Sequence, residues 1–149
     1  MSDSATEEGR RYPRRPLLAA SAAVFQDGCV LIAQRAVPPL TGYWSLPGGL
    51  VEPGEALAAA AAREVLEETG IVAEMTGPAD VVEVIRADDL GRIEHHYVII
   101  AFAGTWRSGT ARAGEATSDV RWVHPAELSG LTLTAGTAEV VRKAARLLA

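Results

Sequence analysis

Residues 49–71 read GLVEPGEALAAAAAREVLEETGI. The part from Gly54 through Thr69 is rich in Ala, Leu and Glu and has no Gly or Pro after its first residue, so it predicts a helix. The Pro53-Gly54 pair predicts a turn before this helix, and Gly70 lies where a left-handed cap residue is expected. Glu55 would place a carboxylate near the positive end of the helix dipole. Both ends of the predicted helix are therefore marked in the sequence.

The predicted helix has one acidic face. At about 100° per residue, Glu64, Glu67 and Glu68 fall together. Like charges at this spacing destabilise a helix by roughly 0.2–0.5 kcal/mol per pair, so the cluster needs a compensating cation, and carboxylate oxygens suit Mg²⁺ or Mn²⁺. Taken alone, such a triplet is more often an ordinary solvated acidic face. The residues expected to pack on the opposite side are Ala58, Ala62, Val65, Leu66 and Thr69.

The segment just upstream favours a site over a solvated surface. Residues 44–49 read WSLPGG, and its paired glycines leave backbone groups open to close approach by a ligand or metal. Arg63 lies four residues before Glu67 and could hold that carboxylate in place through a salt bridge. The loop and the acidic helix are therefore expected to form one site.

Residues 49–71 also match a known sequence pattern. Between Gly49 and Ile71 every fixed position of G-x5-E-x7-R-E-U-x-E-E-x-G-U is present, U being a bulky aliphatic residue. This pattern resembles the Nudix box, and the chain is identified as a member of the Nudix hydrolase family. Flanking sequence such as LIAQR at 31–35 and GYWSLPGG at 42–49 most resembles the ADP-ribose pyrophosphatase-like branch. The resemblance implies an α/β fold, a Nudix-type α/β/α sandwich with a mixed β-sheet.

The resemblance also implies roles for the residues of the box. The metal ligands would be the backbone carbonyl of Gly48 and the carboxylates of Glu64, Glu67 and Glu68. Arg63 would orient these carboxylates, and Glu55 would be structural. The cofactor would be Mg²⁺ or Mn²⁺.

The general base has two candidates in relatives, a glutamate of the box or an acid on a later loop. Glu67 fits the first description. Glu115 fits the second because it precedes the strand expected around 120–123, with Asp119 as the fallback. The alternative for Glu115 is an exposed loop charge.

Two further residues are candidates for substrate binding. Arg35 could contact a phosphate through its forked guanidinium, or it could be a surface arginine at a strand end. Trp44 could stack on a base, or it could be a core aromatic.

The implied activity is metal-dependent hydrolysis of a pyrophosphate bond in a nucleoside diphosphate derivative. ADP-ribose or a related nucleotide sugar is the leading expectation, giving a nucleoside monophosphate and a sugar phosphate. The alternative is a nucleoside triphosphate pyrophosphohydrolase that sanitises the nucleotide pool. A more remote alternative, a non-catalytic domain that senses a nucleotide ligand, is disfavoured because every carboxylate of the box is present.

Composition limits the remaining classes. The chain has 149 residues, 48% of them hydrophobic, which predicts one domain. Its net charge of −5 argues against a nonspecific nucleic-acid or membrane surface. The single Cys29 excludes an internal disulfide framework, which is compatible with a cytoplasmic location. The expected partner is thus a small-molecule nucleotide, with no nucleic acid and no membrane, and relatives are frequently homodimers.

The domain is expected over residues 14–149, after a disordered leader over residues 1–13. The arginines before Leu17 superficially resemble a secretory signal, but cleavage there would remove the first core strand. That strand, over 17–25, and the next, over 30–34, flank Asp27-Gly28, a pair typical of a hairpin turn. Two further strands are expected over 81–87 and 93–105, and a short strand over 120–123. One helical turn is expected over 125–128 and a terminal helix over 134–148.

Overall fold

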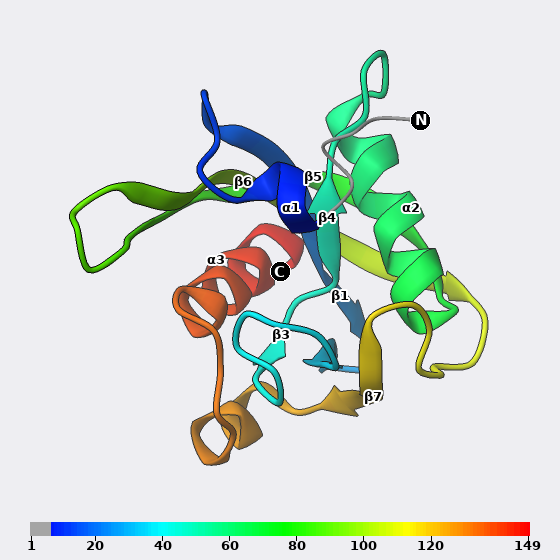
Figure 1. Cartoon of the computed structure of the whole chain (residues 1–149). Coiled ribbons are helices and arrows are strands. Elements are labelled where there is room, and N and C mark those ends of the chain that lie inside the picture. The colour runs from blue at the N-terminus through cyan, green and yellow to red at the C-terminus, as the bar shows by residue number, and fades with distance from the viewer. Residues whose placement is uncertain (1–6) are drawn as a thin grey trace.

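The computed structural model describes residues 7–149 and contains a mixed sheet with helices on its two faces (Figure 1). The helices are α1 (Glu7–Arg10), α2 (Leu57–Thr69) and α3 (Thr137–Leu148), with a 3₁₀ helix, η2 (Pro125–Gly130). The strands are β1 (Leu17–Gln26), β2 (Cys29–Arg35), β3 (Trp44–Ser45), β4 (Gly48–Leu50), β5 (Val72–Ala87), β6 (Ile93–Ser108) and β7 (Thr117–Val123).

Strand β1 lies at the centre of the sheet, whose order is β3-β2-β1-β6-β5. It pairs in parallel with β6, from Leu17 opposite Tyr97 to Phe25 opposite Thr105, while its other pairings are antiparallel. The turn into β2 is Asp27-Gly28, with φ of 51° and 80°, the left-handed backbone that a two-residue hairpin turn requires. The predicted hairpin and the predicted mixed sheet are both confirmed.

The first two strands part soon after their turn. Paired residues between β1 and β2 are limited to Phe25 with Val30 and Gln26 with Cys29. Farther along, β1 pairs instead with β4, and β2 pairs with β3 and β7. Two groups of strands therefore diverge from one hairpin, and segments that are distant in sequence approach each other between them.

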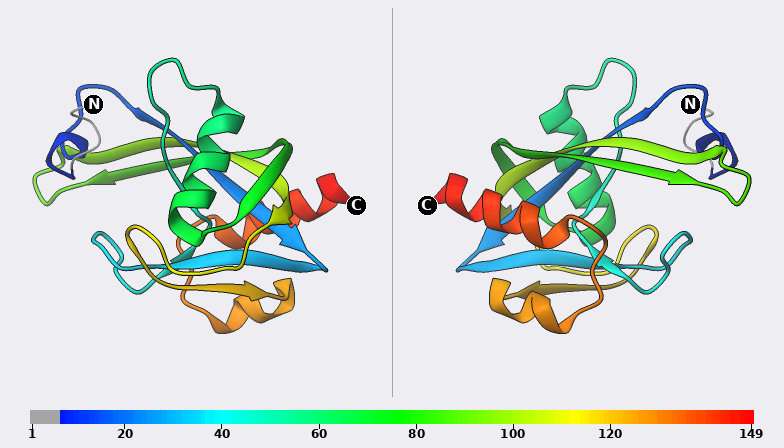
Figure 2. Two further views of the ribbon diagram at one scale, coloured as in Figure 1. Left: turned by 90° about the vertical axis from the view of Figure 1, so that its right-hand side faces the viewer. Right: turned by 90° about the vertical axis from the view of Figure 1, so that its left-hand side faces the viewer.

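The two faces of the sheet carry separate cores, because successive residues of a strand point to opposite sides. Leu31 packs on the side of α2, whereas its neighbours Val30 and Ile32 pack on the side of α3. Figure 2 shows the two helices on opposite faces of the sheet. The predicted α/β/α sandwich is thus confirmed.

Helix α2 differs from the prediction in its start and in its buried face. It begins at Leu57 because Ala56, with ψ of 148°, is still extended, and Gly54 before it has φ of 81°. Its buried residues are Ala60, Ala61, Val65 and Thr69, so the prediction was wrong for Ala58, which is exposed, and for Leu66, which is 47% exposed. At about 100° per residue, Glu64 and Glu68 fall within the arc that these buried residues span, on the side of the helix that faces the sheet. Gly70, with φ of 74°, caps the helix as predicted.

Strand β5 begins at Val72, well before the predicted start at residue 81. Gly77 and Pro78 lie inside it, next to register shifts that absorb them. Proline is tolerated there because β5 is the edge of the sheet and pairs only with β6. Strand β7 and helix α3 confirm the predicted short strand and terminal helix, with starts shifted by three residues each.

The predicted leader over 1–13 is described only from residue 7, so its first six residues lie outside the described part. Residues 11 and 12 contact the β5–β6 hairpin. The Tyr12 amide donates to the carbonyl of Glu94 (2.8 Å), and its hydroxyl donates to Asp88 (2.8 Å). Arg11 pairs with the Glu94 carboxylate. Across residues 7–149, no helix is long and apolar enough to cross a membrane.

Candidate active site

Two adjacent glycines of β4 bring the acidic side of α2 close to the sheet. A Cβ atom on Gly49 would lie only 2.5 Å from Cδ of Glu64, so that carboxyl group rests directly on the glycine. The amide of Gly48 faces Oε1 of Glu68 at 3.4 Å. The paired glycines therefore permit a close approach of α2 to β4, whereas the sequence had predicted that they leave backbone groups open to a ligand or metal.

Arg63 connects the carboxylates of this region. Its Nε and Nη2 donate to the two oxygens of Glu55, at 2.7 and 2.9 Å, which is a bidentate pair. Its Nη1 donates to Oε2 of Glu64 at 2.8 Å and lies 3.2 Å from Oε2 of Glu67. A further bond from Nη2 to the carbonyl of Leu50, at 3.1 Å, anchors the guanidinium to the end of β4. The predicted orienting role of Arg63 has the geometry it needs.

The surroundings of Glu55, Arg63 and Glu68 shift the pKa values of these three groups. The hydrogen bonds from Arg63 lower the pKa of Glu55, and the same bonds raise the pKa of Arg63, so both stay charged. Burial, reinforced by the negative charge of neighbouring Glu64, raises the pKa of Glu68 from 4.5 to about 9. Glu68 is therefore held next to another carboxylate under conditions that disfavour its own charge.

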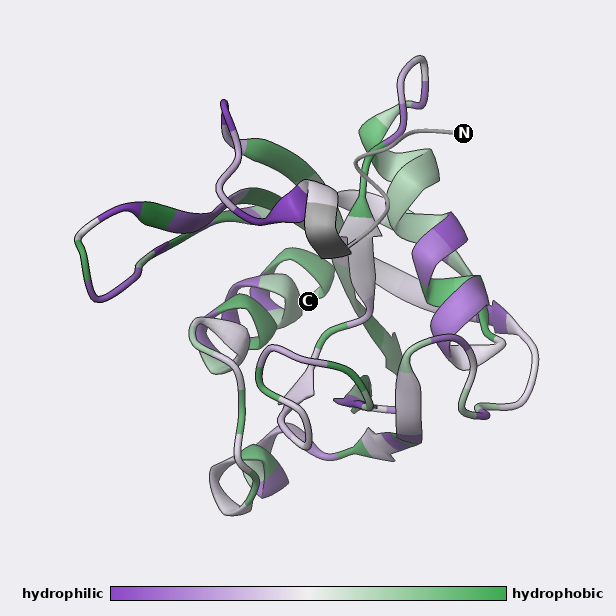
Figure 3. Cartoon of the chain, viewed as in Figure 1, coloured by the Kyte–Doolittle hydropathy of each residue, from purple (hydrophilic) through white to green (hydrophobic). Residues whose placement is uncertain are grey.

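The donors around Glu64 and Glu68 fit a divalent cation by their chemistry. Two carboxylates in contact, one of them half-buried, repel each other, and a hard cation between them would relieve that repulsion. Within residues 7–149, no group of three or more His, Cys, Asp or Glu side chains is arranged so that it could hold a metal ion. The Glu67 side chain is 40% exposed and is turned toward Arg63. In Figure 3 the hydrophilic residues of α2 gather in the second half of the helix.

The loop that follows β6 carries the other candidate base to the same place. The amide of Glu115 donates to the carbonyl of Glu67 at 3.2 Å, and the Glu115 side chain is exposed. Asp119, the fallback, lies on β7, where its carboxylate accepts from Nε of Arg121 at 3.0 Å and from the amide of Val120. Of the two acids, Glu115 is the one beside the end of α2.

The two candidate substrate-binding residues differ in their surroundings. Arg35 lines a hollow of about 60 Å³ together with Gly48 and Glu68, and its Nε donates to the carbonyl of Pro39 at 2.7 Å. This hollow lies between the two diverging groups of strands. Trp44 instead packs in the core on the α3 side and is 6% exposed, so its ring offers little surface on which a base could stack.

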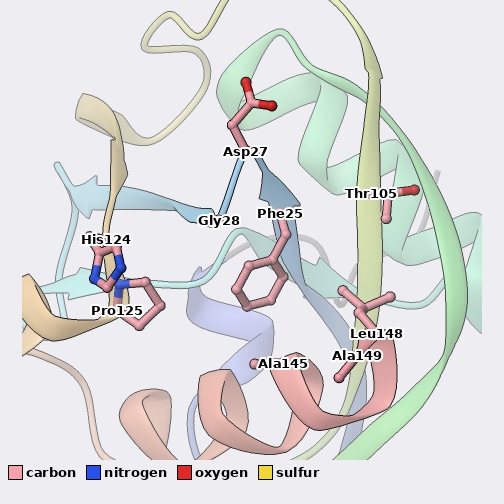
Figure 4. A pocket seen from close by; sticks show the side chains of 9 residues that line it. All are labelled: Phe25, Asp27, Gly28, Thr105, His124, Pro125, Ala145, Leu148 and Ala149. Atoms are coloured by element: carbon pink, nitrogen blue, oxygen red, sulfur yellow. The ribbon is translucent and has the colours of Figure 1, made fainter.

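A larger hollow, of about 460 Å³, lies elsewhere on the molecule (Figure 4). Its walls include Phe25 beside the β1–β2 turn, Pro125 at the start of η2 and Leu148 at the end of α3. It shares no lining residue with the hollow beside Glu68. The candidate site is therefore chosen by its carboxylates and not by the size of a hollow.

Sequence reasoning missed two residues that shape the site. Gly114 and Thr117 hold the loop of Glu115 against α2, since the Gly114 amide and the Thr117 hydroxyl both contact the carbonyl of Glu68. A glycine three residues before a threonine is a local turn signal. That signal does not specify which helix end receives the loop.

Comparison with known proteins agrees with this arrangement. A profile of the NUDIX domain matches residues 15–144. The chain therefore belongs to the Nudix family.

Individual relatives carry different names. A protein of Bacillus subtilis (strain 168) named "Putative 8-oxo-dGTP diphosphatase" is 38% identical over 100 residues, which is 66% of this chain and 60% of that protein. An ADP-ribose pyrophosphatase of Methanocaldococcus jannaschii is 31% identical, over 67% of this chain and 57% of that protein. The matches thus span under two thirds of these relatives. The crystal structure of a MutT NUDIX hydrolase from Burkholderia pseudomallei has a TM-score of 0.75 at 30% identity, covering 87% of this chain and 98% of that one.

Proposed function

We propose that this chain is a metal-dependent Nudix pyrophosphohydrolase acting on nucleoside diphosphate derivatives. The observation that carries the proposal is the acidic end of α2, where Arg63 bonds both Glu64 and Glu67 while Glu68 contacts Gly48. Clustered carboxylates of this kind would hold Mg²⁺ or Mn²⁺, with the carbonyl of Gly48 as an additional oxygen ligand.

Each residue of the candidate site would have a separate role in hydrolysis. A bound divalent ion supplies charge stabilisation to the phosphoryl oxygens and lowers the pKa of water. Glu64 and Glu68 would hold that ion, and Arg63 would keep Glu64 in position through its hydrogen bond. Glu67 or Glu115 would accept the proton of the attacking water. Arg35, at the wall of the hollow beside Glu68, would contact a substrate phosphate.

The leading substrate is ADP-ribose or a related nucleotide sugar, which would yield a nucleoside monophosphate and a sugar phosphate. The flanking sequence and the name of the Methanocaldococcus relative support it. Nucleoside triphosphates are the second candidate, favoured by the names of the Bacillus relative and the Burkholderia structure. Both classes present a pyrophosphate bond to the same carboxylates.

The experiment is release of monophosphate from a panel of ADP-ribose, nucleotide sugars, dinucleoside polyphosphates and nucleoside triphosphates. Each is measured with Mg²⁺, with Mn²⁺ and with EDTA. Wild type should turn over at least one substrate only with metal, and Glu67→Gln should lower kcat by about 100-fold or more. Glu83→Gln, the same change at an exposed position on β5, is the matched control and should match wild type. Absence of metal-dependent turnover on every compound would refute the proposal.

A further inference from the structure

The last carbonyl groups of α2 are all bonded from outside the helix. The final turn of a helix leaves such carbonyls without partners inside it. Here the carbonyl of Leu66 accepts from the Gly70 amide at 2.9 Å, as an ordinary cap. The three that follow are bonded by the loop after β6, through the amides of Glu115 to Glu67 (3.2 Å), Gly114 to Glu68 (3.0 Å) and Arg112 to Thr69 (2.9 Å).

Thr117 ties this loop together at its far end. Its hydroxyl lies 3.1 Å from the carbonyl of Glu68 and 3.1 Å from that of Gly114, and its one proton can go to either. The same oxygen accepts from the Gly114 amide at 2.8 Å. One side chain thus joins the loop both to itself and to the helix that carries the box carboxylates.

The fit leaves no room for a side chain on Gly114. A Cβ atom there would lie 2.1 Å from the carbonyl oxygen of Glu67, which is helix backbone and cannot swing aside. Glycine at 114 is therefore a condition of the contact. We call residues 112–117 the latch.

We propose that the latch, and Thr117 in particular, positions Glu115 for catalysis by fastening its backbone to the end of α2. The inference rests on the proposed function and deepens it. Glu115 has an exposed side chain, so its place is set by its main chain, and that main chain is bonded to Glu67. Glu115 would consequently stay in register with Glu67 and Glu68 in every turnover. Thr117 is a positioning residue, since it acts through Glu115.

Thr117→Val removes the hydroxyl and keeps the shape of the side chain. The hydroxyl donates one hydrogen bond and accepts another, and both are lost. We expect kcat on the best substrate to fall about tenfold, with KM nearly unchanged. Thr117→Ser should restore wild-type kcat because it restores the hydroxyl. Thr76→Val, the same substitution at an exposed position of β5, is the matched control and should be silent.

A double mutant separates positioning from a general structural effect. In a Glu115→Gln background, Thr117→Val should cause no further loss, because both changes act on one group. An equal loss in both backgrounds would overturn the inference. So would wild-type kcat in Thr117→Val, or a Glu115→Gln variant within about threefold of wild type.

Amide hydrogen exchange tests the latch without turnover. The amides of Gly114 and Glu115 should be protected in wild type and should exchange faster in Thr117→Val. Unprotected amides in wild type would overturn the inference even if the enzyme is active. A wild type with protected amides and no metal-dependent turnover would instead overturn the proposed function and, with it, the catalytic role of the latch.

Discussion

The box glycine at position 49 allows catalysis to be perturbed without disturbing the fold. In Gly49→Ala, the new methyl carbon would lie 2.5 Å from Cδ and Oε2 of Glu64 and 2.6 Å from Oε1. Ordinary contacts begin near 3.5 Å, so the carboxyl group must retreat by about 1 Å. It can do so because it ends a flexible side chain and because Gly49 does not have a left-handed backbone.

A displacement of about 1 Å at a catalytic group costs on the order of 100-fold in rate. We therefore expect Gly49→Ala to lower kcat by about 100-fold and to raise the Mg²⁺ concentration for half-maximal rate, with a Tm within about 2 °C of wild type. The assay is a Mg²⁺ titration of turnover beside thermal unfolding of the same sample.

The neighbouring glycine supplies the contrast. A Cβ atom on Gly48 would lie 2.6 Å from the carbonyl oxygen of Ala20 and from Cβ of Ser21, both on β1. Gly48→Ala should accordingly lower the free energy of unfolding, by about 1–3 kcal/mol. Gly130→Ala, where nothing lies within 4 Å, is the control and should change neither property. Wild-type turnover and metal response in Gly49→Ala would refute the reasoning.

Two other predictions concern charge. In Arg63→Lys the bidentate pair with Glu55 is lost, and one ammonium group cannot also reach Glu64 and Glu67. We expect kcat to fall by about tenfold or more in this variant. Normal activity would contradict this. In metal-free protein the pKa of Glu68 is raised from 4.5 to about 9, so its contribution to the free energy of unfolding is present below about pH 4.5 and is lost as pH rises toward about 9. In EDTA, the Tm of Glu68→Gln relative to wild type should therefore increase from about pH 5 to about pH 8, and a constant difference would contradict this.

Local chemistry explains which elements could be predicted from the sequence. Asp27-Gly28 and Gly70 specify their own backbone conformations, so the hairpin and the end of α2 were placed correctly. Strand β5 was predicted too short because Gly77-Pro78 normally interrupts a strand. Its position at the sheet edge and its bulges remove that penalty, and both depend on the tertiary fold.

The sequence predicts the contacts of the candidate site that lie within helix α2. The i,i+4 contact of Arg63 with Glu67 follows from helical spacing. The stronger contact with Glu55 depends on how the chain turns before α2, which spacing alone does not determine. The buried face was misjudged at Ala58 and Leu66 because an alanine run leaves the apolar stripe ambiguous.

The parallel pairing of β1 with β6 also bears on the nascent chain. Its partners lie about 80 residues apart, so β1 leaves the ribosome roughly 4–16 s before the strand that will cover one of its edges. During that interval the backbone N–H and C=O groups along this edge of β1 have no strand to pair with and must remain open to water or to a chaperone. Synthesis of this protein is therefore most exposed to aggregation before β6 emerges, and the pace of translation between the two strands sets how long that exposure lasts.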